Sequence, residues 1–317
     1  MAAWLLLVSP KLQPFTRTTE RQIVQPNPTF NLWDDLQQLL VFHFMQNAFE
    51  AGAIVAVLGG VVGYFMVIRG QSFAGHTLSQ VGFPGAAGAV LVGAPPLLGL
   101  LVFCGGGALA ISVLSRDESR ERRFQTAAIG SILAFSIALG YLFVRLYPGY
   151  TNTALSFLFG TFLGIDDSQV LLLLCVAIVC LGALAVIGRP LLFASVDPDV
   201  AAARGVPVRA LSVAFLVLLG LSVAACALIT GTLLVFALLV APAATAQQFT
   251  ARPALALALS VLIALAVTWL GLSLAYFSIY PIGFFVTSLA FGVYLLARVT
   301  RGLRRRRVRS DFKVAIA

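Results

Sequence analysis

Long apolar runs follow one another along the chain from residue 47 onward. Each run has about 18 to 23 residues, enough to cross a hydrocarbon core of about 30 Å as an α-helix. The runs cover residues 47–68, 76–93, 96–114, 124–146, 168–188, 210–229, 231–249, 254–276 and 281–298. Because a backbone in lipid must satisfy its own hydrogen bonds, the pattern predicts an all-α membrane protein, a polytopic bundle of eight or nine transmembrane helices.

Two stretches bear on the number of spans. Almost no polar loop separates 210–229 from 231–249, which is why the count stays at eight or nine. The run ALSFLFGTFLGI at 154–165 is too short to cross a bilayer. We expect it to form a re-entrant or surface helix.

Composition supports this class of protein. Of the 317 residues, 60% are hydrophobic and only 10% are charged, as in an integral membrane protein. The first 37 residues contain WLLLV, which is too short for the apolar core of a signal peptide, and no convincing cleavage site follows it. We divide the chain into an extracytoplasmic or interfacial segment (1–43), a transmembrane domain (44–298) and a basic cytoplasmic tail (299–317).

The basic residues predict the orientation. Seventeen of the 21 Lys and Arg residues fall in segments that one orientation places in the cytoplasm: Arg69, Arg116 to Arg123, Arg189 to Arg209, Arg252 and the tail from Arg298 onward. The other four would lie outside: Lys11, Arg17, Arg21 and Arg145. The net charge of +9 is therefore mainly a topology signal, and we interpret RGLRRRRVRSDFK at 301–313 as an anchor near anionic lipid rather than a nucleic-acid site.

The sequence contains few residues in patterns typical of catalysis. All four cysteines, Cys104, Cys175, Cys180 and Cys226, fall inside apolar runs without CxxC spacing, so we expect buried packing residues rather than metal ligands or disulfide partners. The sequence has no phosphate-binding loop, and its two histidines form no plausible Ser/His/Asp set. We expect no enzyme activity in this chain, so its energy must come from a partner or a gradient.

A short helix is predicted between the fifth and sixth apolar runs. Asp197 is a plausible N-cap, and Pro198 suits the first helical position. The helix would extend over Asp199 to Arg204, and Gly205 would end it. The residues alone fit equally an ordinary interfacial loop and a coupling helix that docks into a groove on a cytosolic ATPase.

Four stretches, in this order, resemble the permease subunit of the metal-ion ABC importers, which take up zinc, manganese or iron through a substrate-binding protein. They are FMQNAFEAGAIVAVLGGVVGYFMVIRGQSFAGHTLSQVGFPGAAGAVLVG (44–93), ALSFLFGTFLGI (154–165), DPDVAAARGVPV (197–208) and GTLLVFALLVAPAATAQQF (231–249). With the spans between them, the resemblance covers most of residues 44–298. It implies a fold similar to the cobalamin and siderophore importers and a place in the bacterial cytoplasmic membrane.

The resemblance also implies partners. They are a second copy of the permease, two ATPase subunits that hydrolyse ATP, an extracytoplasmic metal-binding protein and the lipid membrane, with no nucleic acid. Residues 197–207 would form the coupling helix to the ATPase. The divalent ion is then the cargo, and no cofactor is expected in this chain. The sequence does not choose the metal, because a transport path binds its ion weakly and briefly.

The chain departs from the family in its second apolar run. Members usually carry a Gly-Asp-Ala-x-Ser-His-like motif where this chain has GHTLSQ at 75–80, so that His76 takes the acidic position and Gln80 the histidine position. Residues four apart are neighbours on a helix, and a polar pair inside a bundle faces a water-filled path or a bonding partner. His76 is either an ion ligand or a structural histidine bonded to a loop carbonyl, and Gln80 either lines the path or bonds between helices.

A second candidate lies nearer the outside. Glu50 is the only carboxylate that the run boundaries place within a membrane helix, and His43 and Gln46 precede it by seven and four residues, on the same helical face. These residues form either a cation entrance or a merely solvated interface. Asp166 and Asp167 are better explained as caps of the next helix than as metal ligands.

Two functions from different classes remain at this point. The favoured one is the permease of an ATP-driven importer of divalent metal ions. The alternative is an autonomous secondary transporter or channel for a small cation. Coupled carriers generally need several buried ionisable groups, and the apolar runs of this chain offer only Glu50 and His76.

Overall fold

The computed structural model describes residues 42–314 apart from 115–121, 147–156, 161–163 and 279. Within these residues the longer elements are all α-helices, and no strand is present. They are α2 (His43–Ile68), α3 (Ser72–Leu91), α4 (Pro96–Leu114), α5 (Arg122–Leu146), α7 (Asp167–Val196), α8 (Pro198–Ala203), α9 (Val208–Thr230), α10 (Leu234–Phe249), α11 (Pro253–Tyr276) and α12 (Ile282–Val314). The predicted all-α class is confirmed.

Each of the nine predicted apolar runs overlaps one long helix of this set. Seven of the described helices are long and apolar enough to cross a membrane. The other two are α10, which has 16 residues and is about 24 Å long, and α3, which carries the polar residues His76 and Gln80. The chain is therefore a multi-pass membrane protein.

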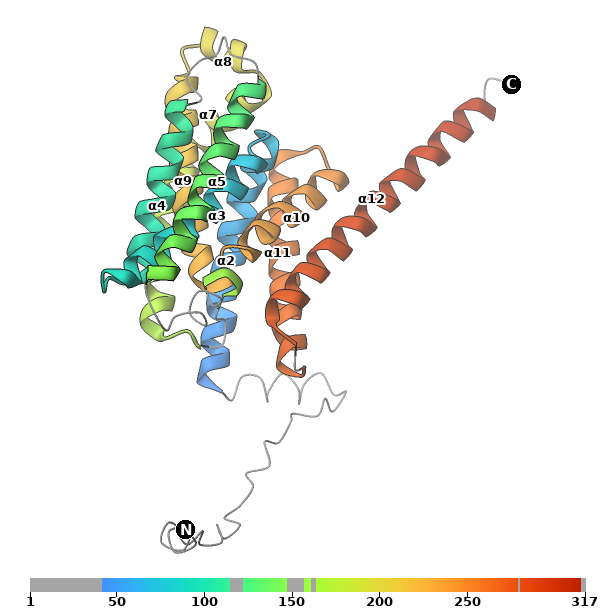
Figure 1. Cartoon of the computed structure of the whole chain (residues 1–317). Coiled ribbons are helices and arrows are strands. Elements are labelled where there is room, and N and C mark those ends of the chain that lie inside the picture. Colours follow the sequence, from blue (N-terminus) through green and yellow to red (C-terminus); the bar gives the residue numbers. More distant parts are fainter. Residues whose placement is uncertain (1–41, 115–121, 147–156, 161–163, 279, 315–317) are drawn as a thin grey trace, which may run out of the picture.

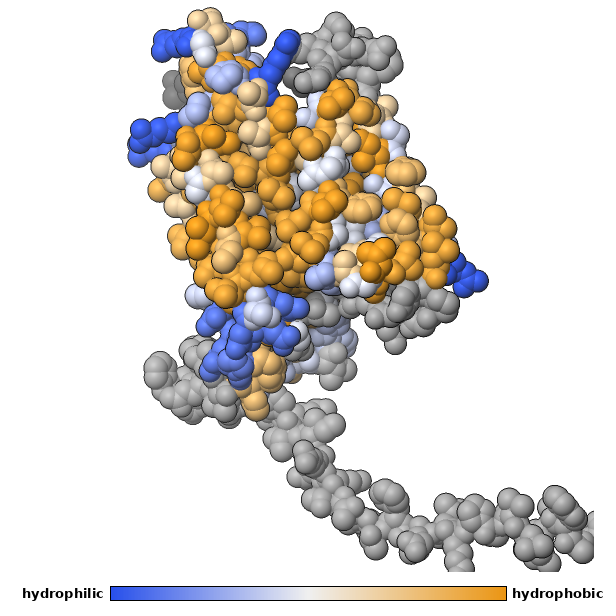
Figure 2. All heavy atoms as spheres, turned by 90° about the vertical axis from the view of Figure 1, so that its left-hand side faces the viewer, coloured by the Kyte–Doolittle hydropathy of each residue, from blue (hydrophilic) through white to orange (hydrophobic). Residues whose placement is uncertain are grey.

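The helices form one bundle around α2, which packs against α7, α9, α10 and α11. On one side α3 packs against α4 and α5, and on the other α12 packs against α10 and α11 before it projects away from the bundle (Figure 1). Figure 2 shows a broad hydrophobic band with hydrophilic residues gathered at its two ends. Large apolar side chains exposed on the described helices include Val102, Phe135, Leu171 and Val186. Such a band suits contact with lipid.

Glycines allow a close helix approach between α3 and α4. Gly85 and Gly99 face each other so closely that a Cβ atom on either one would clash with the carbonyl oxygen of the other. Membrane helices associate through small residues that permit such backbone contact, because lipid provides no hydrophobic drive between them. The crossing fixes the position of α3, which carries His76.

A break separates α9 from α10. Gly231 has a φ of 79°, in the left-handed region that favours glycine, and it ends α9. The backbone N–H groups of Thr232 and Leu233 donate to the carbonyl oxygens of Phe157 and Leu158 at 3.0 and 3.1 Å. Part of the predicted short helix at 154–165 therefore lies against the break as a helical turn at 157–159, while 154–156 and 161–163 lie outside the described residues.

The structure extends two helices beyond their predicted ends. The helix α7 continues through Pro190 to Val196, whereas the predicted span ended at 188. Membrane helices tolerate such a proline because neighbouring groups satisfy the freed carbonyl. The helix α12 continues to Val314, past the predicted start of the tail, because Arg and Lys are good helix formers.

The prediction that all four cysteines are buried is wrong for Cys175. Cys104, Cys180 and Cys226 are buried as predicted, but Cys175 is exposed. Cys175 and Cys180 lie five residues apart on α7, which places them about 140° apart around the helix axis. Both therefore cannot face the bundle, and Cys180 is the one that does.

Candidate functional site

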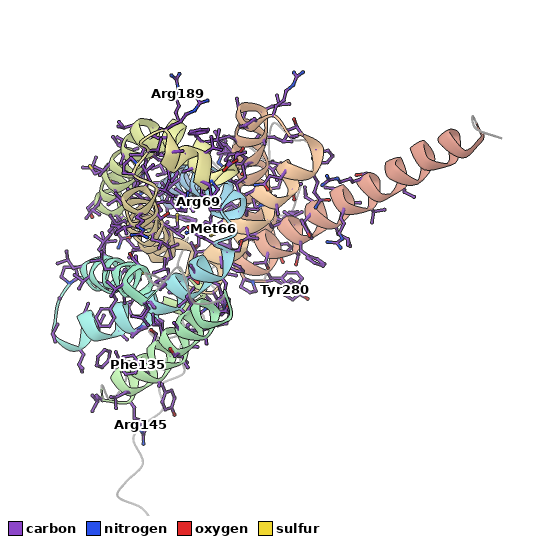
Figure 3. All side chains as sticks on the ribbon, turned by 90° about the horizontal axis from the view of Figure 1, so that it is seen from above. Met66, Arg69, Phe135, Arg145, Arg189 and Tyr280 are labelled. Atoms are coloured by element: carbon purple, nitrogen blue, oxygen red, sulfur yellow. The ribbon has the colours of Figure 1, made fainter. Side chains whose placement is uncertain are left out.

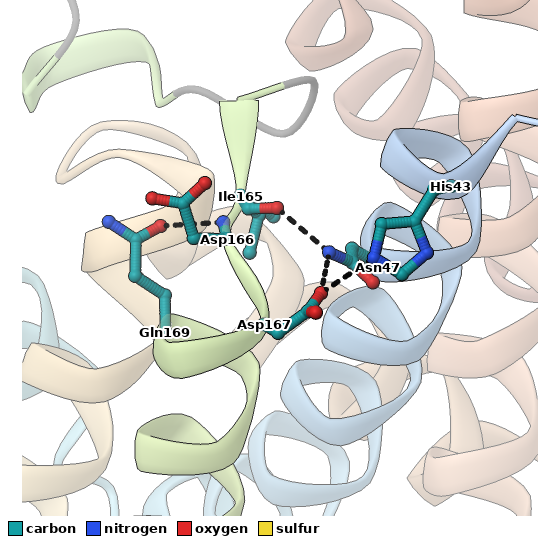
Figure 4. A network of polar contacts seen from close by, with 6 residues as sticks. All are labelled: His43, Asn47, Ile165, Asp166, Asp167 and Gln169. Atoms are coloured by element: carbon teal, nitrogen blue, oxygen red, sulfur yellow. Dashed lines mark hydrogen bonds and ion pairs between the residues drawn. The ribbon is translucent and has the colours of Figure 1, made fainter.

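A polar cluster joins the start of α2 to the start of α7. His43 and Asn47 lie one turn apart on α2, and Asp167 is the first residue of α7. The Oδ1 atom of Asp167 lies 2.9 Å from Nε2 of His43 and accepts a hydrogen bond of 2.6 Å from Nδ2 of Asn47 (Figure 4). The same amide group donates to the carbonyl oxygen of Ile165 at 3.1 Å. We call His43, Asn47 and Asp167 the external cluster.

The two neighbouring aspartates have different roles. Asp166 is the N-cap of α7, and its backbone N–H donates to Oε1 of Gln169 at 3.4 Å, as the capping prediction implied. The carboxylate of Asp167 instead binds side chains of α2, which the sequence analysis did not foresee. The positions of His43 and Asn47, four residues apart on one face, were the available signal.

Glu50 does not join the external cluster in the described part of the chain. Glu50 and Gln46 are both exposed on α2. Among the described residues, no hydrogen bond or ion pair links Glu50 to His43. The described residues also contain no group of three or more His, Cys, Asp or Glu side chains arranged to hold a metal ion. Within the described residues, the cluster offers one imidazole and one carboxylate.

The α3 pair lies deeper in the bundle. His76 is half-buried, and its ring meets the ring of Phe236 on α10 edge-on, at 4.8 Å between centroids. The Nδ1 atom of His76 is buried and has no hydrogen-bond partner among the described residues, so no loop carbonyl holds that atom. Gln80 is buried, with 7% of its surface exposed.

Further polar groups near His76 and Gln80 lack a hydrogen-bond partner among the described residues. Pro84 lacks the N–H group that would bond to the carbonyl of Gln80 one turn earlier in α3. The hydroxyl groups of Thr77 on α3 and Thr232 at the α9–α10 break are also buried without a partner among the described residues. Thr232 lies next to α3, because its methyl group would be 3.4 Å from a Cβ placed on Gly82. An unpaired buried polar group is costly, so this region is suited to receive water or a ligand.

The short helix α8 lies at the end of the bundle opposite the start of α2 (Figure 1). Its predicted local structure is confirmed: Oδ1 of Asp197 accepts a hydrogen bond from the Val200 N–H at 3.0 Å, and Pro198 occupies the first turn. Gly205 has a φ of 81°, as expected of the residue that ends the helix. Asp199 and Arg204 are exposed. The helix therefore presents an acidic and a basic side chain at one tip of the molecule.

Comparisons with known proteins agree with this architecture. The chain is 32% identical to the manganese import system permease protein ScaB of Streptococcus parasanguinis, over 68% of this chain and 75% of that protein. It is 31% identical to the manganese transport system membrane protein MntC of Halalkalibacterium halodurans, over 70% of this chain and 75% of that protein.

Solved structures give the same result. The structure of PsaBC from Streptococcus pneumoniae in complex with Fab matches with a TM-score of 0.75 and 27% identity, over 84% of this chain and 95% of that chain. A metal-chelate type ABC transporter in an inward-facing conformation has a TM-score of 0.70 at 16% identity, over 88% and 91% of the two chains, which shows the fold alone. The profile of the ABC 3 transport family matches residues 41–301, and the chain therefore belongs to that family.

Proposed function

We propose that this protein is the membrane-spanning permease of an ABC importer that moves a divalent metal ion into the cytoplasm. The observation that carries the proposal is the family match over residues 41–301, together with relatives named as manganese import permeases. The ion is the cargo rather than a resident cofactor. Manganese is the first ion to test, with zinc and iron beside it.

The proposal includes partners. Two copies of this chain would form the pore, with ATP hydrolysed on a separate ATPase subunit and the ion delivered by an extracytoplasmic binding protein. The capped helix α8 supports the ATPase contact, because its exposed Asp199 and Arg204 can pair with side chains of a docked subunit. The basic residues assign the end with α8 to the cytoplasm.

The proposed ion path starts near Glu50 and the external cluster and continues along the α3 face that carries His76 and Gln80. Carboxylate and imidazole groups are good ligands for divalent ions, whereas a carboxamide oxygen is a weaker one. A path of a few weak ligands fits transport, since each site must also release the ion. The unpaired Nδ1 atom of His76 supports its role as a ligand on this path.

Charge reversal on α8 tests the assembly. In the complete transporter, Asp199→Lys combined with Arg204→Glu should reduce the amount of ATPase that co-purifies by about tenfold, equivalent to about 1.4 kcal/mol of binding free energy. Arg252→Glu is the matched control, because Arg252 is exposed outside α8 and should leave the ATPase bound. Unchanged ATPase binding after replacement of 198–204 by a Gly/Ser linker would refute the coupling role of α8.

A further inference from the structure

The turn of α3 that carries His76 is held by its neighbours. Gly75 packs so closely against Met66 of α2 that a Cβ atom on Gly75 would clash with the Met66 sulfur. Met66 is fully buried and lies among the helices, whereas Arg189 lies at the edge of the bundle (Figure 3). The carbonyl oxygen of His76 accepts a hydrogen bond of 2.7 Å from the hydroxyl group of Ser79. These contacts fix the backbone from which the imidazole of His76 projects.

The two ring nitrogens of His76 have different surroundings. The Nδ1 atom is buried and has no hydrogen-bond partner among the described residues. The Nε2 atom has no hydrogen bond in the described part of the chain either, but unlike Nδ1 it is not enclosed. Nε2 is therefore the nitrogen of His76 that an ion can reach.

Binding through Nε2 places the ring proton on Nδ1, because a neutral imidazole carries one proton and binds a metal through its other nitrogen. In stable metal sites the N–H group of the second nitrogen donates to a carboxylate, a carbonyl or water. That hydrogen bond fixes the ring and makes the ligating nitrogen more basic. No oxygen atom of the described residues accepts from Nδ1 of His76. His76 therefore lacks the supporting acceptor that strengthens a metal-binding histidine.

Phe236 of α10 lies against the imidazole. The two rings form a T-shaped contact, with 4.8 Å between centroids and 61° between planes. Phe236 is half-buried, as is His76. The face of an aromatic ring is electron-rich, but it accepts an N–H group only weakly. The contact can therefore restrain the imidazole while adding little to the basicity of Nε2.

We propose that Phe236 is a positioning residue for the transported ion. It holds His76 with Nε2 toward the path and, because it stands where an oxygen acceptor would strengthen the ligand, it keeps the bond between Nε2 and the ion weak. A transport site must release its ion in every cycle, so a weak ligand favours turnover over affinity. This inference rests on the proposed function, since it concerns the same path.

The test measures the initial rate of manganese and of zinc uptake against ion concentration, per molecule of permease, in cells with the complete transporter. Phe236→Gln brings an amide oxygen, a possible acceptor for Nδ1, to the position of the ring. Phe236→Leu removes the aromatic ring and stays apolar. Phe103→Leu is the matched control, because Phe103 is also a half-buried phenylalanine of the bundle but lies on α4, beside Gly85 rather than beside His76.

We expect Phe236→Gln to lower both the KM and the maximal rate by about fivefold, because a stronger ligand binds the ion more tightly and releases it more slowly. Phe236→Leu should raise the KM by about fivefold, since the imidazole is less restrained, and leave the maximal rate within about twofold. Phe103→Leu should change neither value by more than about twofold. A purely structural role of Phe236 would change the amount of permease in the membrane and not the KM.

An unchanged KM in both Phe236 variants would overturn the inference and leave the proposed function standing. Equal changes in Phe236→Leu and Phe103→Leu would also overturn it, because they would show a general effect of packing. If Phe236→Gln does not reach the membrane, the KM of Phe236→Leu decides the result. An unmodified transporter that takes up neither manganese, zinc nor iron would refute the proposed function itself, and this inference with it.

Discussion

The external cluster and the α3 face differ in whether their polar groups have hydrogen-bond partners among the described residues. In the external cluster, His43, Asn47 and Asp167 bond to one another, and together they hold two helices in register. On the α3 face, Nδ1 of His76 and the hydroxyl of Thr77 are buried without partners among the described residues. Paired groups stabilise the fold, whereas unpaired ones reduce its stability unless something binds them. We therefore expect the external cluster to act mainly as a structural joint between α2 and α7, and the α3 face to be where a passing ligand binds.

The largest expected effect is on transport, from His76→Ala. This change removes an imidazole from the proposed path but breaks no hydrogen bond at Nδ1, so uptake should fall by about tenfold or more while the free energy of unfolding changes by less than about 1 kcal/mol. The measurement is uptake of radiolabelled manganese by cells with the complete transporter, together with the amount of permease in the membrane. Lower abundance with normal uptake per molecule would show instead that His76 is a structural tether.

A double variant sharpens the same test. His76→Asp with Gln80→His installs the family-like pair of carboxylate and imidazole on the same helical face. Uptake should recover to within about threefold of the unmodified rate, with a shifted preference among manganese, zinc and iron. Failure of the double variant to transport more than His76→Ala would contradict a ligand role for this pair.

The second effect is on stability, from Asn47→Ala in the external cluster. Asn47 is buried and donates to both Asp167 and the carbonyl of Ile165, so its loss should reduce the free energy of unfolding by about 1 to 3 kcal/mol. Thermal unfolding in detergent measures this change, and uptake per folded molecule should stay within about twofold. Ser168→Ala, at an exposed position in the first turn of α7, should cost less than about 0.5 kcal/mol. The comparison fails if Asn47→Ala abolishes uptake without loss of stability.

The smallest effect is expected from Glu50→Gln. Glu50 is exposed, so removing its charge should lower uptake by about two- to threefold at low ionic strength, and salt should weaken the effect. Expression and ATPase association should not change. Uptake at several salt concentrations measures this. A loss as large as that of His76→Ala would place Glu50 among the direct ligands.

Much of the fold could be predicted because its signals are local. Long apolar runs predicted the spans, and Asp197, Pro198 and Gly205 predicted α8 from cap chemistry alone. The bond between Asn47 and Asp167 joins residues 120 positions apart, and no local pattern encodes it. The burial of Cys180 rather than Cys175 also depends on how α7 is rotated in the bundle.

The same difference between local signals and contacts of distant residues applies to the candidate site. The sequence singled out His76 and Gln80 because polar residues in an apolar run are rare. It could not show that His76 meets Phe236 of α10, or that Thr232 at the helix break lies beside α3, because both neighbours come from distant parts of the chain. Arg69 was assigned only to topology, yet it lines a cavity of about 1260 Å³ at the α8 end of the bundle.

The length of α12 has a consequence for its far end. With 33 residues the helix extends about 50 Å, some 20 Å more than a hydrocarbon core of about 30 Å. A free peptide of that extra length would rarely be helical in water, because forming the first turn is unfavourable. In α12 the turns packed in the bundle already form the helical nucleus, so the extra residues only have to lengthen an existing helix. A reporter protein fused to its end would stand away from α8 and leave that tip of the molecule accessible (Figure 1).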